Sequence, residues 1–377
     1  MRRRQLVFAS LLTALAAVTA AADDGDGRPA LKDVFADVFL IGGALKTSQI
    51  LGEEPEAMAL VERHFNTITA ENDMKWEKIH PEPDRYNFAV ADAFVEFGEK
   101  NGMFVVGHTL VWRNQTPRWV FRGDDGNPAG RDTLLQRMKE HIDTVAGRYR
   151  GRVHAWDVVN EAFGPDGSFR RNYFYRIIGD DFIEKAFAFA HEADPGAELY
   201  YNDFDMWKPG KVERVVRLVR DLQAKGIRID GVGMQGHWGH DFPAYDEVAE
   251  AIRTFADVGM KVMVTEMDIT MLPGAEGYRG ADITKRFEGR NELNPYVDGL
   301  PGDVHALLDE RYAAFFKIFA DHRDAFARVT LWGVNDGNSW LNNWPIRGRT
   351  EYPLLFDRNN QPKSTFDAVV KVMNVEP

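Results

Sequence analysis

Short runs of apolar and β-branched residues recur along the chain and alternate with longer segments of helical periodicity. Eight such runs begin at Phe39, Thr67, Phe104, Val153, Glu198, Gly231, Lys261 and Val329. The clearest helical patterns between them span 132–148, 180–193, 211–224, 245–258 and 304–322. Alternation at these spacings predicts βαβ units and a parallel sheet. Eight units without a leftover domain predict one closed (β/α)8 TIM barrel, with its active site at the C-terminal ends of the strands.

The first 22 residues have the pattern of a secretory signal peptide. Arg2, Arg3 and Arg4 precede an apolar run from Leu6 to Val18, and the small residues of 19–22 follow. The apolar run is too short to span a bilayer. We therefore expect residues 1–22 to be removed on export, to the periplasm or beyond, and 23–377 to form one catalytic domain without a membrane span. Residues 271–302 form a long irregular stretch of the kind that is usually functional or mobile.

Composition and charge restrict the classes of partner that the protein can bind. The formal charge of the 377 residues is −12, and removing three Arg leaves 43 basic against 58 acidic residues, or −15. Without a basic run after the signal, we expect no nucleic-acid partner. The chain contains no cysteine, so disulfides and thiolate metal sites are excluded. Nine Trp, several of them beside polar motifs, favour a cleft that stacks flat apolar ligands. We expect a monomer.

Seven of the predicted strands end in a polar or aromatic cluster. The clusters are 71–73, 108–112, 160–161, 202–203, 235–237, 266–268 and 332–336. Any one of them could be a helix cap or a hydrogen-bonded core residue. Caps do not require Trp, His, Gln and Glu together, however, and in a barrel all these strand ends face one bowl. The clusters therefore predict one shared site.

Glu161 and Glu266 stand out because each follows an apolar run and should emerge in that bowl. Two acids facing each other across a pocket are the minimum needed to split a glycosidic bond, one giving a proton and the other attacking the anomeric carbon or activating water. Asn160 could hydrogen-bond a sugar hydroxyl. The alternative, an internal ion pair, is disfavoured because neither acid has a basic residue within three positions.

Two other motifs suggest cofactors only at first sight. Residues 231–236 fit G-x-G-x-x-G, but the segment after them opens no amphipathic helix, as a dinucleotide site would require. His237 and His240 lack a nearby third metal ligand. We expect neither cofactor nor metal.

Seven motifs in order resemble glycoside hydrolase family 10, the retaining endo-1,4-β-xylanases, over about residues 30–373. They are TAENDMKW (69–76), GHTLVW (107–112), WDVVNEAF (156–163), YYNDF (200–204), GMQGHW (233–238), VTEMDI (264–269) and LWGVNDGNSW (331–340). The resemblance implies that xylan and xylo-oligosaccharides are the substrates. It also implies that Glu161 is the acid/base, that Glu266 is the nucleophile, and that His237 bridges Glu266 and Asp268.

Further residues resemble the family's substrate contacts. Nine of them resemble contacts to the part of the substrate that becomes bonded to the enzyme: Glu71, Asn72, Lys75, His108, Trp112, Gln115, Gln235, Trp332 and Trp340. Asn202 resembles a contact on the leaving-group side.

Four positions depart from the family pattern: Arg113, Met267, Asn335 and Leu341. We expect all four near the cleft, where they would change sugar affinities, and none in contact with the chemistry. Two other functions stay open: another two-carboxylate barrel glycosidase acting on β-glucan or mannan, and a carbohydrate-binding protein that has lost catalysis. Both intact glutamates argue against the second.

Overall fold

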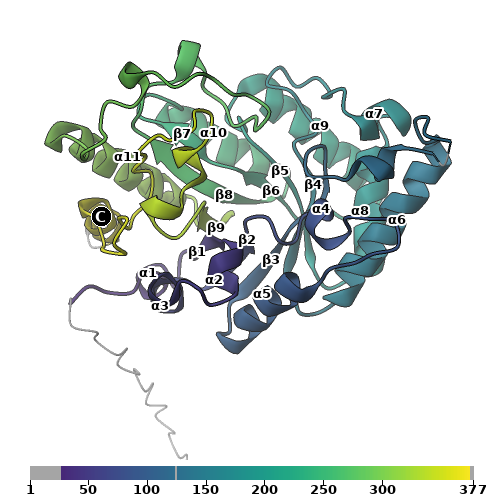
Figure 1. The fold of residues 1–377 in the computed structure, drawn as a ribbon, viewed down its shortest axis with the longest axis horizontal. Helices are drawn as coiled ribbons and strands as arrows, with labels where there is room; N and C mark the ends of the chain where they lie inside the picture. The colour runs from purple at the N-terminus through teal and green to yellow at the C-terminus, as the bar shows by residue number, and fades with distance from the viewer. Residues whose placement is uncertain (1–26, 124, 374–377) are drawn as a thin grey trace, which may run out of the picture.

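Eight parallel strands form a closed barrel in the computed structural model, which describes residues 27–123 and 125–373. The barrel strands are β1 (Leu40–Leu45), β2 (Thr67–Ala70), β3 (Phe104–Trp112), β4 (Ala155–Asn160), β5 (Glu198–Asp203), β6 (Gly231–Met234), β8 (Lys261–Thr270) and β9 (Phe326–Leu331). Neighbours in sequence pair throughout, and β1 also pairs with β9, with Gly42 opposite Thr330. The predicted (β/α)8 barrel is confirmed (Figure 1).

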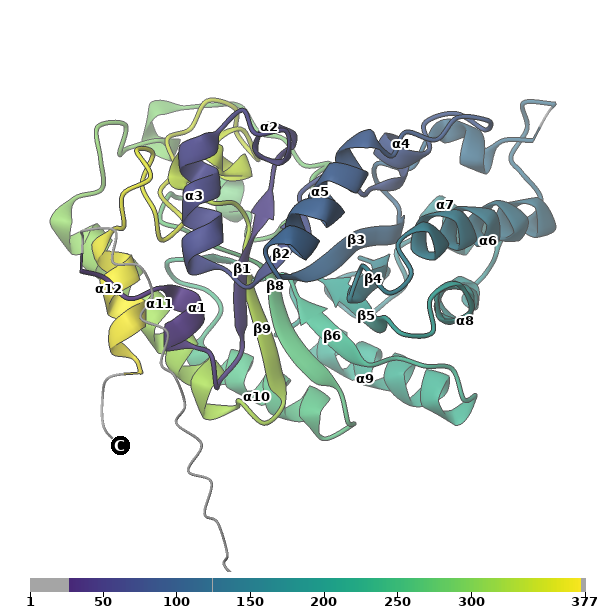
Figure 2. The same ribbon diagram turned by 90° about the horizontal axis from the view of Figure 1, so that it is seen from below.

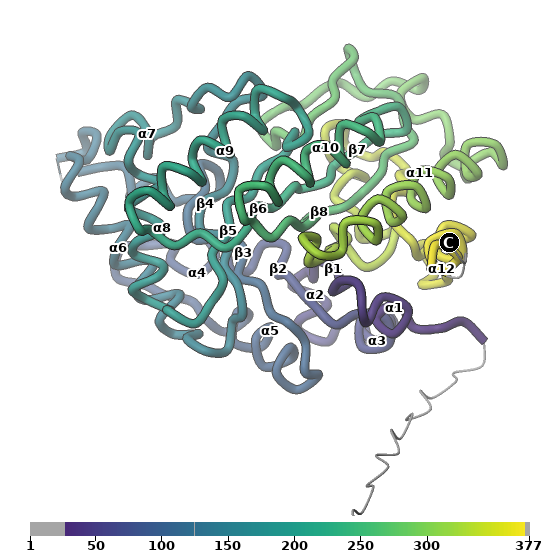
Figure 3. Tube along the Cα trace, turned by 180° about the vertical axis from the view of Figure 1, so that it is seen from behind, coloured from purple at the N-terminus to yellow at the C-terminus, as the bar shows by residue number. Residues whose placement is uncertain are grey.

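The major helices surround the barrel on the outside (Figures 2 and 3). Their bounds are α1 (Leu31–Val34), α2 (Thr47–Ile50), α3 (Pro55–His64), α4 (Trp76–Ile79), α5 (Ala89–Lys100), α6 (Arg131–Arg148), α7 (Tyr173–Ile177), α8 (Phe182–Ala193), α9 (Pro209–Ala224), α10 (Tyr245–Ala256), α11 (Gly302–Asp321) and α12 (Ser364–Lys371). The five predicted helices correspond to α6, α8, α9, α10 and α11. Between the strands and these helices lies one large hydrophobic core.

Two strand details differ from the sequence-based expectation. The last strand begins at Phe326 instead of Val329, because Phe326 and Arg328 already pair with β8. An additional short strand, β7 (His237–Gly239), follows β6 after a break at Gly236, whose φ of 87° is the left-handed conformation that glycine tolerates. β7 pairs with the end of β8 and places His237 opposite Asp268.

On the outer side of the β3–β4 pair, Gly107 packs closely against Trp156. A Cβ atom on Gly107 would lie 2.1 Å from the Trp156 ring, so only glycine fits there. The segment 271–302 contains only two short 3-10 turns, Ala275–Gly277 and Asn291–Leu293, as the sequence predicted. Among the described residues, no helix is both long and apolar enough to cross a membrane.

Candidate active site

The strand-end residues converge on a cavity of about 310 Å³. Thirteen predicted site residues line it: Glu71, Asn72, Lys75, His108, Trp112, Gln115, Asn160, Glu161, Gln235, His237, Glu266, Trp332 and Trp340. The other two, Asn202 and Asp268, are buried and hydrogen-bond residues of the lining. The polar clusters at the ends of different strands therefore come together at one cavity, as predicted.

Glu266, in β8, is almost fully buried and has two polar partners. Asn202 Nδ2 donates to its Oε1 at 2.7 Å, and His237 Nε2 lies 3.3 Å from its Oε2. Burial alone would raise the pKa of this carboxyl. The hydrogen bond from His237 and the positive charges nearby, including Lys75, outweigh burial and lower the pKa of Glu266 below its ordinary value. Glu266 is therefore held as a carboxylate.

His237 is supported in turn by Asp268, which the β7–β8 pairing places beside it. The distance from His237 Nδ1 to Asp268 Oδ1 is 2.9 Å. Burial opposes a charge on the imidazole, but Asp268 and Glu266 together raise the pKa of His237 to about 10. His237 is then a cation at neutral pH, and both ring nitrogens donate to carboxylates.

Trp340 completes this chain of contacts. Its indole Nε1 donates to Asp268 Oδ2 at 2.7 Å. Its ring stacks on Trp344, with 4.3 Å between ring centroids and 14° between planes. The indole is fixed on one face and at one edge while it lines the cavity.

Glu161 follows β4 directly and has a backbone φ of 57°, a conformation that non-glycine residues rarely adopt. Arg113 Nη2 donates to its Oε2 at 3.0 Å, and Gln235 Nε2 lies 3.3 Å from its Oε1. Burial raises the pKa of Glu161 and outweighs Arg113, which acts in the opposite direction, while Asp203 adds to the rise. Glu161 therefore tends to hold a proton where Glu266 does not.

The amide oxygen of Asn160 connects the environments of the two acids. It accepts from Asn202 Nδ2 and from Gln235 Nε2, both at 3.2 Å. Asn202 also donates to Glu266, and Gln235 to Glu161. A protonatable acid and a stable carboxylate thus share one fixed amide frame, which suits a reaction that needs a proton donor and an anion in one cleft.

A second hydrogen-bonded group forms another part of the wall. Lys75 Nζ contacts Asn72 Oδ1 and Gln115 Oε1, both at 3.1 Å, and lies 4.7 Å from the centre of the Trp112 ring. Gln115 Nε2 also donates to Asn72 Oδ1 at 3.1 Å. These amides and the ammonium point into the cavity beside an aromatic surface, an arrangement that suits hydroxyl-rich ligands.

Arg113 corrects one expectation and one inference. It was not expected to contact the chemistry, yet it forms an ion pair with Glu161. The sequence disfavours an ion pair at Glu161, because no basic residue lies within three positions of it. The partner comes from the end of another strand, 48 residues earlier, so sequence proximity was the wrong criterion.

The other three departures from the family pattern do not line this cavity. Met267 lies next to Glu266, but its side chain is packed in the hydrophobic core and does not reach the cavity. Asn335 also lies elsewhere, where its side chain accepts from the Asn338 amide and donates to Asn360. Leu341 lines a neighbouring cavity.

Sequence reasoning missed several lining residues, among them Lys46, Arg286 and Trp344. Lys46 had a usable signal, because it is the first polar residue after the first strand. Arg286 belongs to the irregular segment 271–302, where no periodicity indicates which side chains face inward.

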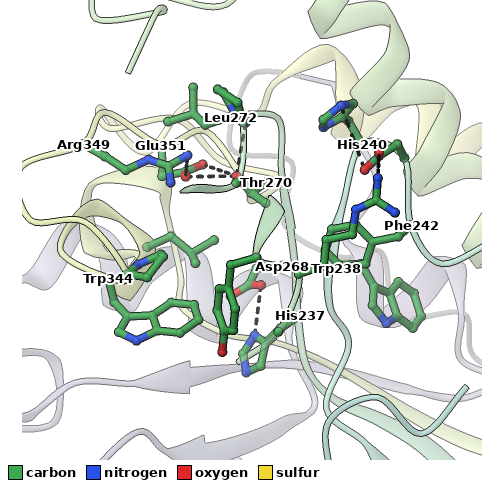
Figure 4. Close-up of a pocket in the computed structure, with 18 of the residues that line it drawn as sticks. His237, Trp238, His240, Phe242, Asp268, Thr270, Leu272, Trp344, Arg349 and Glu351 are labelled. Atoms are coloured by element: carbon green, nitrogen blue, oxygen red, sulfur yellow. Dashed lines mark hydrogen bonds and ion pairs between the residues drawn. The ribbon is translucent and has the colours of Figure 1, made fainter. Parts of the chain in front are cut away.

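The neighbouring cavity, of about 210 Å³, shares His237 and Trp344 with the first and is also lined by Asp268 (Figure 4). Within it, Thr270 donates to both carboxylate oxygens of Glu351, at 2.9 and 3.0 Å. Burial raises the pKa of Glu351 to about 7, against the effect of Arg349. Among the described residues, no group of three or more His, Asp or Glu is placed to hold a metal ion.

Comparisons with known proteins agree with this geometry. The profile of Glycosyl hydrolase family 10 matches residues 30–372. The Endo-1,4-beta-xylanase A of Xylanibacter ruminicola is 46% identical over 345 residues, covering 92% of this chain and 94% of that protein. The Beta-1,4-xylanase of Dictyoglomus thermophilum is 44% identical, covering 91% of each chain.

Solved structures are similar over the same range. An endoxylanase retrieved from a sugarcane soil metagenome has a TM-score of 0.87 at 44% identity, covering 92% of this chain and 100% of the other. A xylanase from Paenibacillus barcinonensis, solved with a conduramine derivative, has a TM-score of 0.82 at 38% identity, covering 92% and 99%.

Proposed function

The chain belongs to glycosyl hydrolase family 10 and is a retaining endo-1,4-β-xylanase, and we propose that Glu161 and Glu266 carry out its reaction. The observation that supports these roles is the opposite displacement of their pKa values within one cavity, upward for Glu161 and downward for Glu266. A double displacement needs this pairing of a proton donor with an ionised nucleophile.

In the first step a Glu266 carboxylate oxygen attacks the anomeric carbon of the sugar. The bond from that carbon to the glycosidic oxygen breaks, its electron pair goes to the oxygen, and the oxygen takes the proton of Glu161. Asn202 and His237 hold Glu266 by one hydrogen bond to each of its carboxylate oxygens. The products are a covalent glycosyl-enzyme and a shortened xylan chain.

In the second step Glu161 acts as a base instead of an acid. Glu266 is now an ester without charge, so a negative charge on Glu161 no longer meets a second carboxylate in the cavity. Glu161 accepts a proton from water as the water oxygen attacks the anomeric carbon. The ester bond to Glu266 breaks and restores its carboxylate. Two inversions return the β configuration.

We propose that the wall residues bind the sugars on the glycosyl-enzyme side. Lys75, Asn72 and Gln115 would meet sugar hydroxyls through their ammonium and amide groups, and Trp340 would meet a ring face. Asn202 is buried and bonded to Glu266, so we assign it to positioning the nucleophile instead of to the leaving-group side.

The roles are tested by Glu161→Ala and Glu266→Ala. With Glu161→Ala, cleavage of xylan should fall steeply, while bond cleavage in an aryl xylobioside should survive, because an aryl leaving group needs no proton. Added azide should then yield a β-xylobiosyl azide by attacking the glycosyl-enzyme. With Glu266→Ala, both substrates should fail, and azide should yield the α-azide.

The proposal also covers export and substrate. Residues 1–22, outside the described part, would be removed on export, leaving a monomeric enzyme that acts on xylan and xylo-oligosaccharides. Mass spectrometry of the secreted chain checks whether residues 1–22 are removed, and light scattering checks whether the enzyme is a monomer. A reducing-sugar assay on xylan, carboxymethylcellulose and mannan checks the substrate, and xylan should give the highest rate.

The two glutamate variants also show how the assignment of roles could fail. If Glu161→Ala and Glu266→Ala behave in the reverse way, the two roles are exchanged.

A further inference from the structure

Arg113 joins Glu161 to a distant segment of the chain. Its Nη2 atom lies 3.0 Å from Glu161 Oε2 and 3.2 Å from Asp282 Oδ1. Arg113 follows β3, whereas Asp282 belongs to the irregular segment after β8. Only 12% of the Arg113 side chain is exposed, so solvent screens its interaction with the two carboxylates only weakly.

Asp282 is held in place by its own segment. Thr284 donates to Asp282 Oδ1 from its backbone amide, at 3.1 Å, and from its hydroxyl, at 2.8 Å. The backbone amide of Asp282 lies 2.9 Å from the Tyr278 hydroxyl oxygen. Arg170 Nη1 approaches its other carboxylate oxygen at 3.6 Å. The carboxylate is therefore a charge at a fixed position.

We propose that Arg113 is a positioning residue for Glu161, and that Asp282 sets how strongly the Arg113 charge acts on Glu161. The pair thereby fixes the upper end of the pH range in which Glu161 can give its proton to the leaving sugar. This inference rests on the acid/base role proposed above for Glu161.

The physical reason lies in the two tasks of Glu161. A guanidinium at hydrogen-bond distance stabilises the carboxylate, which helps Glu161 as a base and weakens its hold on the proton it must first carry. Asp282 withdraws part of that stabilisation by sharing the same guanidinium. Arg113 can then fix the position of the carboxyl while burial still keeps the pKa of Glu161 above its ordinary value.

Three other charged groups near Glu161 keep their partners when this pair is changed: Lys75 after β2, Asp203 at the end of β5 and Glu266 in β8. Arg170 after β4 does not, because it also approaches Asp282 at 3.6 Å. In Asp282→Asn the freed charge of Arg170 lowers the pKa of Glu161, which is the same direction as the effect through Arg113. Asp203 is paired with Lys211 at 2.8 Å, and Gln235 from β6 is neutral.

The experiment measures kcat/KM on xylotetraose against pH for Arg113→Gln, Asp282→Asn and the double variant. At high pH, kcat/KM should fall as Glu161 loses its proton, and this fall is the basic limb of the profile. Loss of the guanidinium should move the basic limb to higher pH, and loss of Asp282 should move it to lower pH, each by about one unit. The double variant should lie closer to Arg113→Gln than to Asp282→Asn, because Asp282 acts mainly through Arg113, its nearer partner, and less through Arg170. Asn at 282 keeps the oxygen that accepts from Thr284. A merely structural role would not give shifts of opposite sign.

A matched control is the Arg148–Asp92 pair between α6 and α5, far from the cavity. Arg148→Gln and Asp92→Asn should leave the limb in place. Arg113→Lys, which keeps the charge, should leave the limb near its wild-type position and lower kcat. This variant and Asp282→Asn decide the matter if Arg113→Gln does not fold.

Shifts in the same direction, or no shift, in variants that fold would overturn the role of the pair. Glu161→Ala separates that failure from failure of the proposed function. If Glu161→Ala abolishes xylotetraose cleavage while the pair variants leave the limb unmoved, only the inference is wrong. If Glu161→Ala keeps the basic limb, Glu161 is not the acid. In that case the proposed role of Glu161 and the inference about Arg113 and Asp282 are both wrong.

Discussion

The indole of Trp340 donates a 2.7 Å hydrogen bond to Asp268, the same carboxylate that supports His237. A residue of the cavity wall is thus linked, through Asp268 and His237, to the proposed nucleophile Glu266. The proposed sugar contact and the proposed nucleophile therefore share one chain of contacts.

Trp340→Phe tests this link, because Phe keeps an aromatic surface but cannot donate to Asp268. Loss of one hydrogen bond to a charged group costs roughly 1.5–3 kcal/mol, so kcat should fall by about tenfold or more. KM for xylobiosides should change little. Steady-state kinetics on an aryl xylobioside measures both. A rise in KM with kcat unchanged would show that Trp340 only binds sugar.

Trp340→Ala tests sugar selection. Xylose differs from glucose by lacking the C6 hydroxymethyl group, and a rigid wall excludes such a group better than a loss of contacts does. Trp340 is rigid because it is stacked on Trp344 and bonded to Asp268. The variant should lower kcat/KM for an aryl xylobioside and raise the relative rate on an aryl cellobioside. Equal losses on both substrates would place xylose selection elsewhere.

Asn202→Ala should raise the pKa of Glu266, because the variant removes the 2.7 Å donor to its carboxylate. The acidic limb of kcat/KM should then move to higher pH by about one unit. Thr265→Val is the matched control, since Thr265 donates only to the Asn202 amide oxygen and should give a smaller shift. An unmoved acidic limb in Asn202→Ala would show that this bond does not stabilise the charge.

His237 makes stability depend on pH in a stated direction. Its pKa is raised from 6.5 to about 10 in the folded protein, so its contribution is fully present below pH 6.5 and is lost as pH rises through 10. The difference in unfolding free energy between wild type and His237→Gln should therefore be largest near pH 6 and shrink towards pH 10. Urea unfolding at several pH values measures it. A difference independent of pH would contradict a charged His237.

The barrel could be predicted from sequence because its signals are local. Each buried strand is a short apolar run, and each polar cluster lies where its strand ends, so the residues that face the bowl were identifiable. The short strand at His237 was missed because three residues carry no periodicity. Its pairing depends on the bend at Gly236 and on the length of β8, which are tertiary features.

Contacts between distant segments could not be predicted from spacing along the chain, and the bridge from His237 to Glu266 and Asp268 was expected only from the family resemblance. Arg113 reaches Glu161 because β3 and β4 are neighbours in the barrel, and Asp282 reaches Arg113 from a segment without regular structure. Neither distance is encoded in spacing along the chain. Likewise, the tie between Trp340 and Asp268 depends on how the segment after β9 folds over β8.

The left-handed backbone at Glu161 has a consequence for the stability of the protein. A side chain at φ 57° costs of order 1 kcal/mol, which the surrounding fold must supply. Glycine adopts this conformation at no steric cost, so Glu161→Gly should melt at a higher temperature than Glu161→Ala. The enzyme thus retains at its catalytic centre a residue that a search for thermal stability alone would replace. Selection for activity and selection for stability oppose each other at this position.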